Sequence, residues 1–204
     1  MKTIAIVGNA QFNADYSHVV DSSDFVIRFN EAGYYSKNNG IKVDALCLTN
    51  LASPGRTSAK YRTVLKLSFL DEVKEVWFPR PGPTPWQFWV RPFIRRWFHQ
   101  ANYAKYIVKR NNLQNKKIIN FSQELYDQSC IELEIPLSFP LGAKEYYPSS
   151  GYLAINYVLQ RFKSESFKIM LLGFTFNGID CHHWKRERNM VSKLEKAGVI
   201  EWLK

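Results

Sequence analysis

The sequence has few cysteines and lacks a long apolar run. Its three cysteines, Cys47, Cys130 and Cys181, are an odd number without close spacing, which indicates a reducing compartment rather than a disulfide framework. Because no run of about 18 apolar residues occurs, we expect no membrane-spanning helix. Polar side chains interrupt residues 1–8 too early for a signal peptide. These absences predict a soluble, cytoplasmic protein.

Acidic residues are also scarce. The 204-residue chain contains 28 Lys and Arg against 18 Asp and Glu, which gives a net charge of +10. This balance predicts an anionic partner: a nucleic acid, a membrane surface or a phosphorylated small molecule. Hydrophobic residues make up 46% and charged residues 23%, which is typical of globular proteins and excludes a disordered or collagen-like chain. The length favours one domain, residues 1–204.

Short apolar runs alternate with helix-like stretches along the chain. The runs predict buried strands at residues 4–7, 25–29, 43–48, 73–78, 118–119 and 169–172. Helices are expected at residues 61–70, 86–111, 122–132, 152–162 and 184–197. This alternation predicts an α/β fold whose mostly parallel sheet is flanked by helices. Ligands bind beyond the carboxyl ends of such strands, so the loops after Val7, Phe29 and Leu172 are candidate ligand sites.

Two of these strand ends carry polar residues. Gly8 would let the backbone approach a ligand and Asn9 would offer a donor and an acceptor, although an ordinary strand-to-loop turn is the more frequent explanation. The later glycines of the dinucleotide-binding fingerprint are missing. Arg28 lies inside an apolar strand that ends at Asn30. Either Arg28 braces a site at which Asn30 contacts the ligand, or it reaches solvent from a sheet edge.

Two later segments could bind or act on an anion. Ser149, Ser150 and Gly151 precede a run of helix formers, so they form either an anion site at a helix N-terminus or an ordinary cap. His182 and His183 follow the strand predicted at residues 169–172, and one of them would suit a general base. A surface histidine pair is the alternative. Zinc is disfavoured because adjacent histidines do not readily face one metal and no cysteine pair is available.

The segment 86–117 contains no acidic residue. Arginines and lysines alternate there with Trp86, Trp89, Trp97 and other aromatic residues. The pattern is typical of an interfacial membrane element or of a surface for an anionic substrate. Nucleic-acid binding uses the same residue types. A helix that packs its aromatic residues on the core and exposes its charges would also explain the pattern.

In combination, these segments resemble the sialyltransferases of glycosyltransferase family 29, and a small bacterial-type member in particular. Residues 6–10, followed by Asp21 and residues 24–32, are similar to the large sialylmotif of that family. Residues 148–151, followed by 169–174, are similar to its small motif. His182 with Glu187 five residues later is similar to its very small motif. The likeness covers both ends of the chain but not residues 51–145.

The resemblance implies a Rossmann-like, GT-A-variant fold and an inverting transfer of an acidic sugar from its cytidine monophosphate (CMP) conjugate to a glycan or glycolipid. It implies CMP-Neu5Ac or CMP-Kdo as donor, with no metal or other cofactor. Glu187 would brace the helix that follows it. His182 or His183 would be the catalytic base, and the donor would contact Gly8, Asn9, Asn30, Ser149, Ser150, Gly151 and Gly173.

The resemblance also bears on partners. Together with the cysteine usage and the basic aromatic segment, it leads us to expect a cytoplasmic enzyme that builds a surface glycan at the inner membrane face. Residues 86–117 would hold it near anionic lipid or a charged acceptor, and no nucleic acid is expected. The alternatives are a basic nucleic-acid-binding module without enzymatic activity and a catalytically inactive scaffold associated with a membrane.

Overall fold

Strands from both ends of the chain form one parallel sheet in the computed structural model, which describes residues 1–35, 38–51, 65–91, 101–137 and 145–203. The strand order is β5-β4-β3-β2-β1-β6-β7, and every neighbouring pair is parallel. The strands are β1 Lys2–Val7, β2 Phe25–Phe29, β3 Ala45–Cys47, β4 Glu75–Phe78, β5 Lys117–Asn120, β6 Phe167–Leu172 and β7 Ile200–Leu203. Together with the flanking helices, this sheet confirms the predicted Rossmann-like α/β fold.

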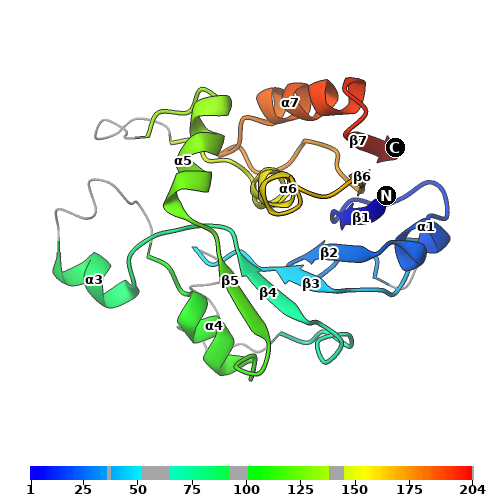
Figure 1. Cartoon of the computed structure of the whole chain (residues 1–204). Helices are drawn as coiled ribbons and strands as arrows, with labels where there is room; N and C mark the ends of the chain where they lie inside the picture. The colour runs from blue at the N-terminus through cyan, green and yellow to red at the C-terminus, as the bar shows by residue number, and fades with distance from the viewer. Residues whose placement is uncertain (36–37, 52–64, 92–100, 138–144, 204) are drawn as a thin grey trace.

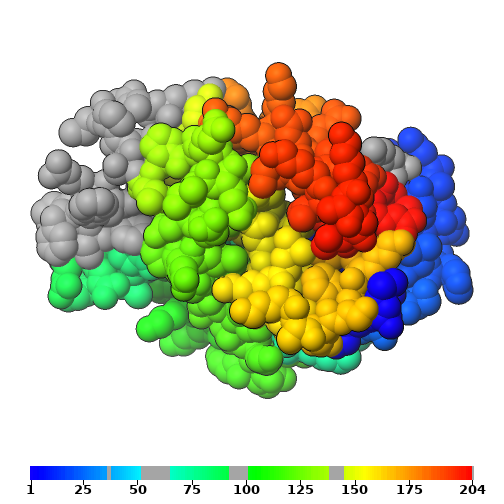
Figure 2. All heavy atoms as spheres, turned by 45° about the horizontal axis from the view of Figure 1, so that its top comes forward, coloured from blue at the N-terminus to red at the C-terminus, as the bar shows by residue number. Residues whose placement is uncertain are grey.

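Helices cover both faces of the sheet (Figure 1). In the described residues they are α1 Ser17–Ser22, α3 Pro85–Val90, α4 Ala104–Arg110, α5 Gln123–Glu132, α6 Ser150–Arg161 and α7 Trp184–Lys196. Helices α5, α6 and α7 lie on one face, with α6 between the other two (Figures 1 and 2), and α1 and α4 lie on the opposite face. Within the part of the chain that the structure describes, none of the helices has the length and apolar character needed to cross a bilayer.

The central strand β1 shows why the sequence reads as continuous apolar runs. Its side chains alternate between two cores, because successive residues of a strand point to opposite faces. Ile4 and Ile6 pack in the core that contains Leu153 of α6, whereas Ala5 and Val7 pack in a core that contains Val20 of α1. Since both faces are covered by helices, both sets of residues must be apolar.

The helix predicted at residues 86–111 is wrong as one continuous element. Helix α3 ends at Val90, residues 101–103 are not helical, and α4 begins only at Ala104. Arg91 has φ −118° and ψ 83°, outside the helical region. Pro92 follows it in the sequence, and the proline ring disfavours the α conformation in the preceding residue. The break was therefore detectable from the sequence; residues 92–100 lie outside the described residues.

The helix predicted at residues 61–70 is also wrong where the structure describes it. Residues 65–67 are irregular and residues 68–70 form a turn, while residues 61–64 lie outside the described residues. The buried side chain of Asn111 accepts a hydrogen bond from the Leu65 N–H at 2.6 Å. Leu65 and Leu67 pack against the core that contains Val76. These tertiary contacts hold the segment in a non-helical form, although its composition favours a helix.

Two elements were missed by the sequence prediction, α1 and β7. Strand β7 pairs with β6 at the edge of the sheet, with Ile200 and Trp202 buried and the residues between and after them half-buried. This alternation was a readable signal of a strand. Helix α1 has only six residues and no side-chain cap at its start, so it offered little periodic signal.

The strand order reverses between β1 and β6. The chain proceeds from β1 to β2 on one side, whereas it proceeds from β6 to β7 on the other. Loops that leave neighbouring strands in opposite directions open a crevice at the carboxyl ends of those strands, which is where doubly wound sheets bind their ligands. The crevice expected here lies just after Val7 and Leu172.

Candidate active site

Two glycines let the loops after β1 and β6 pass in close contact. The Gly8 N–H donates to the Leu172 carbonyl oxygen at 2.8 Å, and the Ala10 N–H donates to the Gly173 carbonyl oxygen at 3.2 Å. A Cβ atom on Gly8 would lie 2.3 Å from the Gly173 oxygen, closer than any side chain tolerates. Gly173 has φ +65°, in the left-handed region that favours glycine. Both glycines are therefore required by the backbone at the mouth of the crevice.

A pocket of about 380 Å³ occupies this crevice. Its size falls in the range of small-molecule sites, which is roughly 300–1,000 Å³. Eight of the nine residues proposed from the sequence line it: Gly8, Asn9, Asn30, Ser149, Ser150, Gly151, Gly173 and His182. Segments that are up to about 170 residues apart in sequence thus converge at the position predicted by the strand ends.

Asn9 and Asn30 are each held by a hydrogen bond to their side-chain oxygen. The Gly33 N–H donates to Asn9 Oδ1 at 3.0 Å, and the Thr49 N–H donates to Asn30 Oδ1 at 2.9 Å. Asn30 has φ +50°, a conformation that asparagine tolerates better than most residues. With the oxygens engaged, the amide NH₂ groups are what these side chains can offer to a ligand.

Arg28 braces the loop that holds Asn9. Its side chain is buried in an interior strand and donates hydrogen bonds to carbonyl oxygens of residues 39–42 at 2.7–3.0 Å. Its Nη1 also donates to Asn39 Oδ1, and Asn39 in turn donates to the Gly33 carbonyl oxygen. Burial lowers the pKa of Arg28 to about 10, so the group stays charged at neutral pH. The alternative, an arginine reaching solvent from a sheet edge, is wrong.

The N-terminus of α6 faces the same pocket. Ser149 caps the helix, because its Oγ accepts the Tyr152 N–H at 3.1 Å. The N–H groups of Ser150 and Gly151 belong to the first turn, which has no intrahelical acceptors. A Cβ on Gly151 would lie 2.5 Å from Phe174 Cε1, so a side chain here would crowd the pocket wall. This end of the helix combines free N–H donors with the positive pole of the helix dipole, a combination that binds anions.

A buried carboxyl group from α7 supports this helix start. Glu187 accepts the Ser149 N–H on Oε1 at 2.8 Å and the Ser149 hydroxyl on Oε2 at 2.6 Å. Its side chain is 0% exposed, and this burial raises its pKa to about 7 despite the two hydrogen bonds and the nearby charge of Arg80. Glu187 was expected to brace the helix that follows it. Its hydrogen bonds instead run to the cap of α6, so it joins α7 to α6.

His182 is oriented by a backbone carbonyl group. Its Nδ1 lies 2.7 Å from the Tyr147 oxygen, and because a carbonyl only accepts, Nδ1 carries the proton. In the neutral ring, Nε2 then holds the lone pair, and Cys181 Sγ lies 3.8 Å from it. Burial lowers the pKa of His182 and the charge of Arg80 lowers it further, against the hydrogen bond to Tyr147. The ring is therefore neutral at physiological pH, in the form required of a general base.

The second histidine lies elsewhere. His183 does not line the pocket; its ring stacks on Tyr146 with the centroids 3.8 Å apart and the planes 18° apart. It also holds the N-cap position of α7. The geometry therefore favours His182 over His183 as the base. Among the residues that the structure describes, no three His, Cys, Asp or Glu side chains gather to form a metal site.

Sequence reasoning missed several residues of the site. Thr49, Phe174, Thr175 and Asn177 line the pocket, and all follow strands, so the strand-end rule was a usable signal for them. Arg80 gave no such signal. It is buried, donates from Nη2 to the Pro148 carbonyl oxygen at 2.8 Å, and thereby anchors the segment leading into α6.

The fold is shared with solved sialyltransferase structures. A crystal structure of a mammalian sialyltransferase aligns with 100% of this chain and 69% of its own, with a TM-score of 0.63 and 18% identity. A mammalian sialyltransferase in complex with Gal-beta-1-3GalNAc-ortho-nitrophenol aligns over the same shares, with a TM-score of 0.58 and 16% identity. The sialyltransferase CstII from Campylobacter jejuni, in complex with the substrate analogue CMP-3FNeuAc, aligns with 99% of this chain and 80% of its own. Its TM-score is 0.50 and its sequence identity is 17%.

Sequence comparison adds no family assignment: neither a protein-family model nor a curated protein sequence matches this chain. The alignment spans the whole chain, so it includes the described parts of residues 51–145, where the sequence carried no recognisable motif. The chain therefore has a sialyltransferase-like fold.

Proposed function

We propose that this protein is a small sialyltransferase-like enzyme, related to glycosyltransferase family 29, that transfers an acidic 2-keto sugar from its CMP conjugate to a hydroxyl group of a glycan. One observation carries the proposal. In a fold shared with sialyltransferases, the strand-reversal crevice brings a half-buried neutral imidazole, His182, into one pocket with the free N-terminus of α6. A base and an anion site in one crevice are the two elements that such a transfer requires.

The donor is bound through its negative charges and its nucleotide. The phosphate and the sugar carboxylate are placed at the N–H groups of Ser150 and Gly151, where the helix dipole favours anions. The amide groups of Asn9 and Asn30 are placed against the nucleotide. CMP-Neu5Ac and CMP-Kdo share the carboxylate beside the anomeric carbon. The analogue named with the Campylobacter jejuni structure, CMP-3FNeuAc, favours sialic acid.

The reaction is a single displacement at the anomeric carbon. The acceptor oxygen attacks this carbon as His182 Nε2 takes the hydroxyl proton, and the bond to the CMP phosphate oxygen breaks with its electron pair leaving on the phosphate. Attack opposite the leaving group inverts the configuration. General-base help of this kind accelerates a reaction by about 10²–10⁴-fold.

The leaving group is stabilised by the start of α6. Negative charge develops on the single phosphate of CMP, and donors already fixed in position act on it without reorganising. A helix N-terminus contributes about 0.3–1 kcal/mol to a nearby anion, and up to about 2 kcal/mol in a partly buried site. Glu187 and Arg80 hold these donors in place through Ser149 and Pro148. We therefore propose that the transfer requires no metal.

We also place the enzyme at an anionic membrane surface. The side chains of Trp86, Trp89 and Val90 on α3 are 65%, 64% and 51% exposed, and none of the α3 residues is buried. Exposed tryptophans beside arginine and lysine are typical of elements that lie in the headgroup region. Vesicles containing phosphatidylglycerol should sediment the protein, and Trp86→Ser with Trp89→Ser should weaken this; equal binding to neutral vesicles would contradict the placement.

The activity is tested with both donors and a matched pair of histidine variants. Transfer from CMP-Neu5Ac and from CMP-Kdo to a glycan acceptor is measured for the wild type, His182→Ala and His183→Ala. We expect His182→Ala to lose about 10²–10⁴-fold in turnover while CMP still binds, and His183→Ala to stay near the wild type. Near wild-type turnover of His182→Ala would falsify the assignment of the base.

The nucleic-acid-binding alternative is separated by thermal stability. A ligand at 100 times its Kd stabilises the folded state by about 2.7 kcal/mol, so CMP should raise the Tm measurably. Stabilisation by a single-stranded oligonucleotide alone, falling steeply with salt concentration, would instead favour a binding module that uses the net charge of +10.

A further inference from the structure

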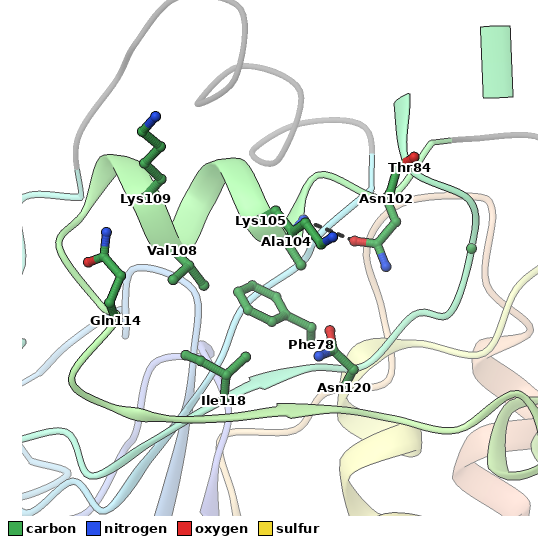
Figure 3. Close-up of a pocket in the computed structure, with 11 residues that line it drawn as sticks. Phe78, Thr84, Asn102, Ala104, Lys105, Val108, Lys109, Gln114, Ile118 and Asn120 are labelled. Atoms are coloured by element: carbon green, nitrogen blue, oxygen red, sulfur yellow. Dashed lines mark hydrogen bonds between the residues drawn. The ribbon is translucent and has the colours of Figure 1, made fainter. Parts of the chain in front are cut away.

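A second pocket, larger than the candidate active site, lies on the opposite face of the sheet. Its volume is about 690 Å³, and it opens between α4 and the carboxyl ends of β4 and β5 (Figure 3). Helix α4 covers the face of the sheet opposite to α6, so this pocket is separate from the crevice that contains His182 (Figure 1). The proposed transfer makes no use of it.

The floor of the pocket is apolar. Phe78 of β4, Ile118 of β5 and Val108 of α4 point toward one another between the helix and the two strands (Figure 3). Ala104 completes this surface at the start of α4. Three separate elements supply these side chains, so the concavity is built by the tertiary structure. Such a floor suits an alkyl chain rather than a sugar, because it offers apolar contact with no hydrogen-bonding groups.

The rim is cationic. Lys105 and Lys109 line the pocket one helical turn apart on α4, and both are exposed. Like charges at this spacing destabilise a helix, and a bound anion would relieve their repulsion. None of the described residues that line the pocket carries a carboxylate, and the sequence contains no acidic residue between Glu75 and Glu124. The rim therefore complements an anion.

The pocket adjoins the exposed aromatic surface of α3. Thr84 lines the pocket and also caps α3, because its Oγ1 accepts the Gln87 N–H. Trp86 and Trp89, with most of their surface exposed, follow within the next two turns. An apolar cavity with a cationic rim therefore opens beside the two tryptophans that are the most exposed aromatic side chains among the described residues.

From this arrangement we infer that the pocket binds a lipid phosphate, with the alkyl chain against the half-buried side chains of Val108 and Ile118 and the phosphate at Lys105 and Lys109. The amide side chains of Gln114 and Asn120 at the mouth add hydrogen-bond donors for the headgroup, whereas Asn102 already donates to the Arg80 carbonyl oxygen at 3.3 Å. This inference does not depend on the proposed transferase activity, since no described residue lines both pockets.

The test uses octyl phosphate below its micellar concentration and measures binding by titration calorimetry. Inorganic phosphate and octyl glucoside are the comparison ligands, because the first retains only the phosphate and the second only the alkyl chain. The variants are Lys105→Gln with Lys109→Gln for the rim and Val108→Asp for the floor. Lys193→Gln with Lys196→Gln, on the last turn of α7, is the control with the same change in charge.

We expect saturable binding of octyl phosphate that weakens at least about tenfold in the rim variant and in the floor variant and is unchanged in the control. Vesicles containing phosphatidic acid should displace it, whereas neutral phosphatidylcholine vesicles should not. Absence of binding, equal affinity in the rim variant and the control, or equal affinity for either comparison ligand would overturn the inference. So would failure of phosphatidic acid to compete.

Two further measurements keep the test decisive. The rim lysines are exposed, so the rim variant is expected to fold even if Val108→Asp does not, and its melting curve checks this. CMP binding is titrated in parallel on the same proteins. Loss of octyl phosphate binding with CMP binding intact locates the effect in this pocket, whereas absence of CMP binding in the wild type contradicts the proposed donor site alone.

Discussion

The buried carboxyl group of Glu187 makes the stability of the fold depend on pH in a way that can be isolated. Its pKa is about 7 in the folded protein, against an ordinary value of 4.5. A carboxyl group whose pKa is raised on folding stabilises the native state fully below pH 4.5. That contribution is lost as the pH rises through 7. The rise corresponds to about 3 kcal/mol in total, of which about 2–3 kcal/mol falls between pH 5 and pH 8.

Glu187→Gln removes this titration while keeping the shape. The glutamine oxygen accepts the Ser149 N–H, and its NH₂ group donates to the Ser149 hydroxyl oxygen, as a protonated carboxyl would. Because the other titrating groups are common to both proteins, they cancel in the comparison. The stability of the variant relative to the wild type should therefore rise by about 2–3 kcal/mol from pH 5 to pH 8.

Urea unfolding at the two pH values, followed by circular dichroism, measures this difference. A difference in unfolding free energy between variant and wild type that is the same at pH 5 and pH 8 would refute the reasoning. So would a wild type whose stability relative to the variant is higher at pH 8 than at pH 5. Glu187→Ala serves as the second variant. It leaves the buried N–H and hydroxyl of Ser149 without an acceptor, which should cost about 1–3 kcal/mol for each group at both pH values.

Three further predictions concern the crevice. Gly8→Ala should destabilise the fold by about 1–3 kcal/mol or more, because its Cβ would lie 2.3 Å from a backbone oxygen; unchanged thermal unfolding would contradict the clash. The rate of transfer should increase with pH as His182 loses its proton, and the midpoint of this increase should lie below pH 6.5 because the pKa of His182 is lowered. Glu187→Gln should retain the same pH profile. A midpoint above pH 6.5 would argue against His182 as the base. Transfer should persist in EDTA, and a complete loss reversed by zinc would indicate a metal site.

Much of the architecture was predictable from the sequence because it is encoded by neighbouring residues. The apolar run of β1, the serine that caps α6 and the long periodic helix α7 are local signals, and the structure places them where the sequence predicted. The strand-end rule then located the crevice before any contact was known. Proline at position 92 and the alternation in β7 were equally local, so the errors there were failures to use an available signal.

Local sequence patterns therefore predicted the fold class, most of the strands and helices, and the short segments able to bind an anion or to accept a proton. Packing between distant segments established that Gly8 and Gly173 must touch, that His182 faces the pocket while His183 stacks on Tyr146, and that Glu187 supports α6. The pocket beside α4 was likewise not predictable from the sequence. Contacts between residues far apart in the chain depend on strand pairing and packing, and the secondary-structure propensity of neighbouring residues determines neither of these.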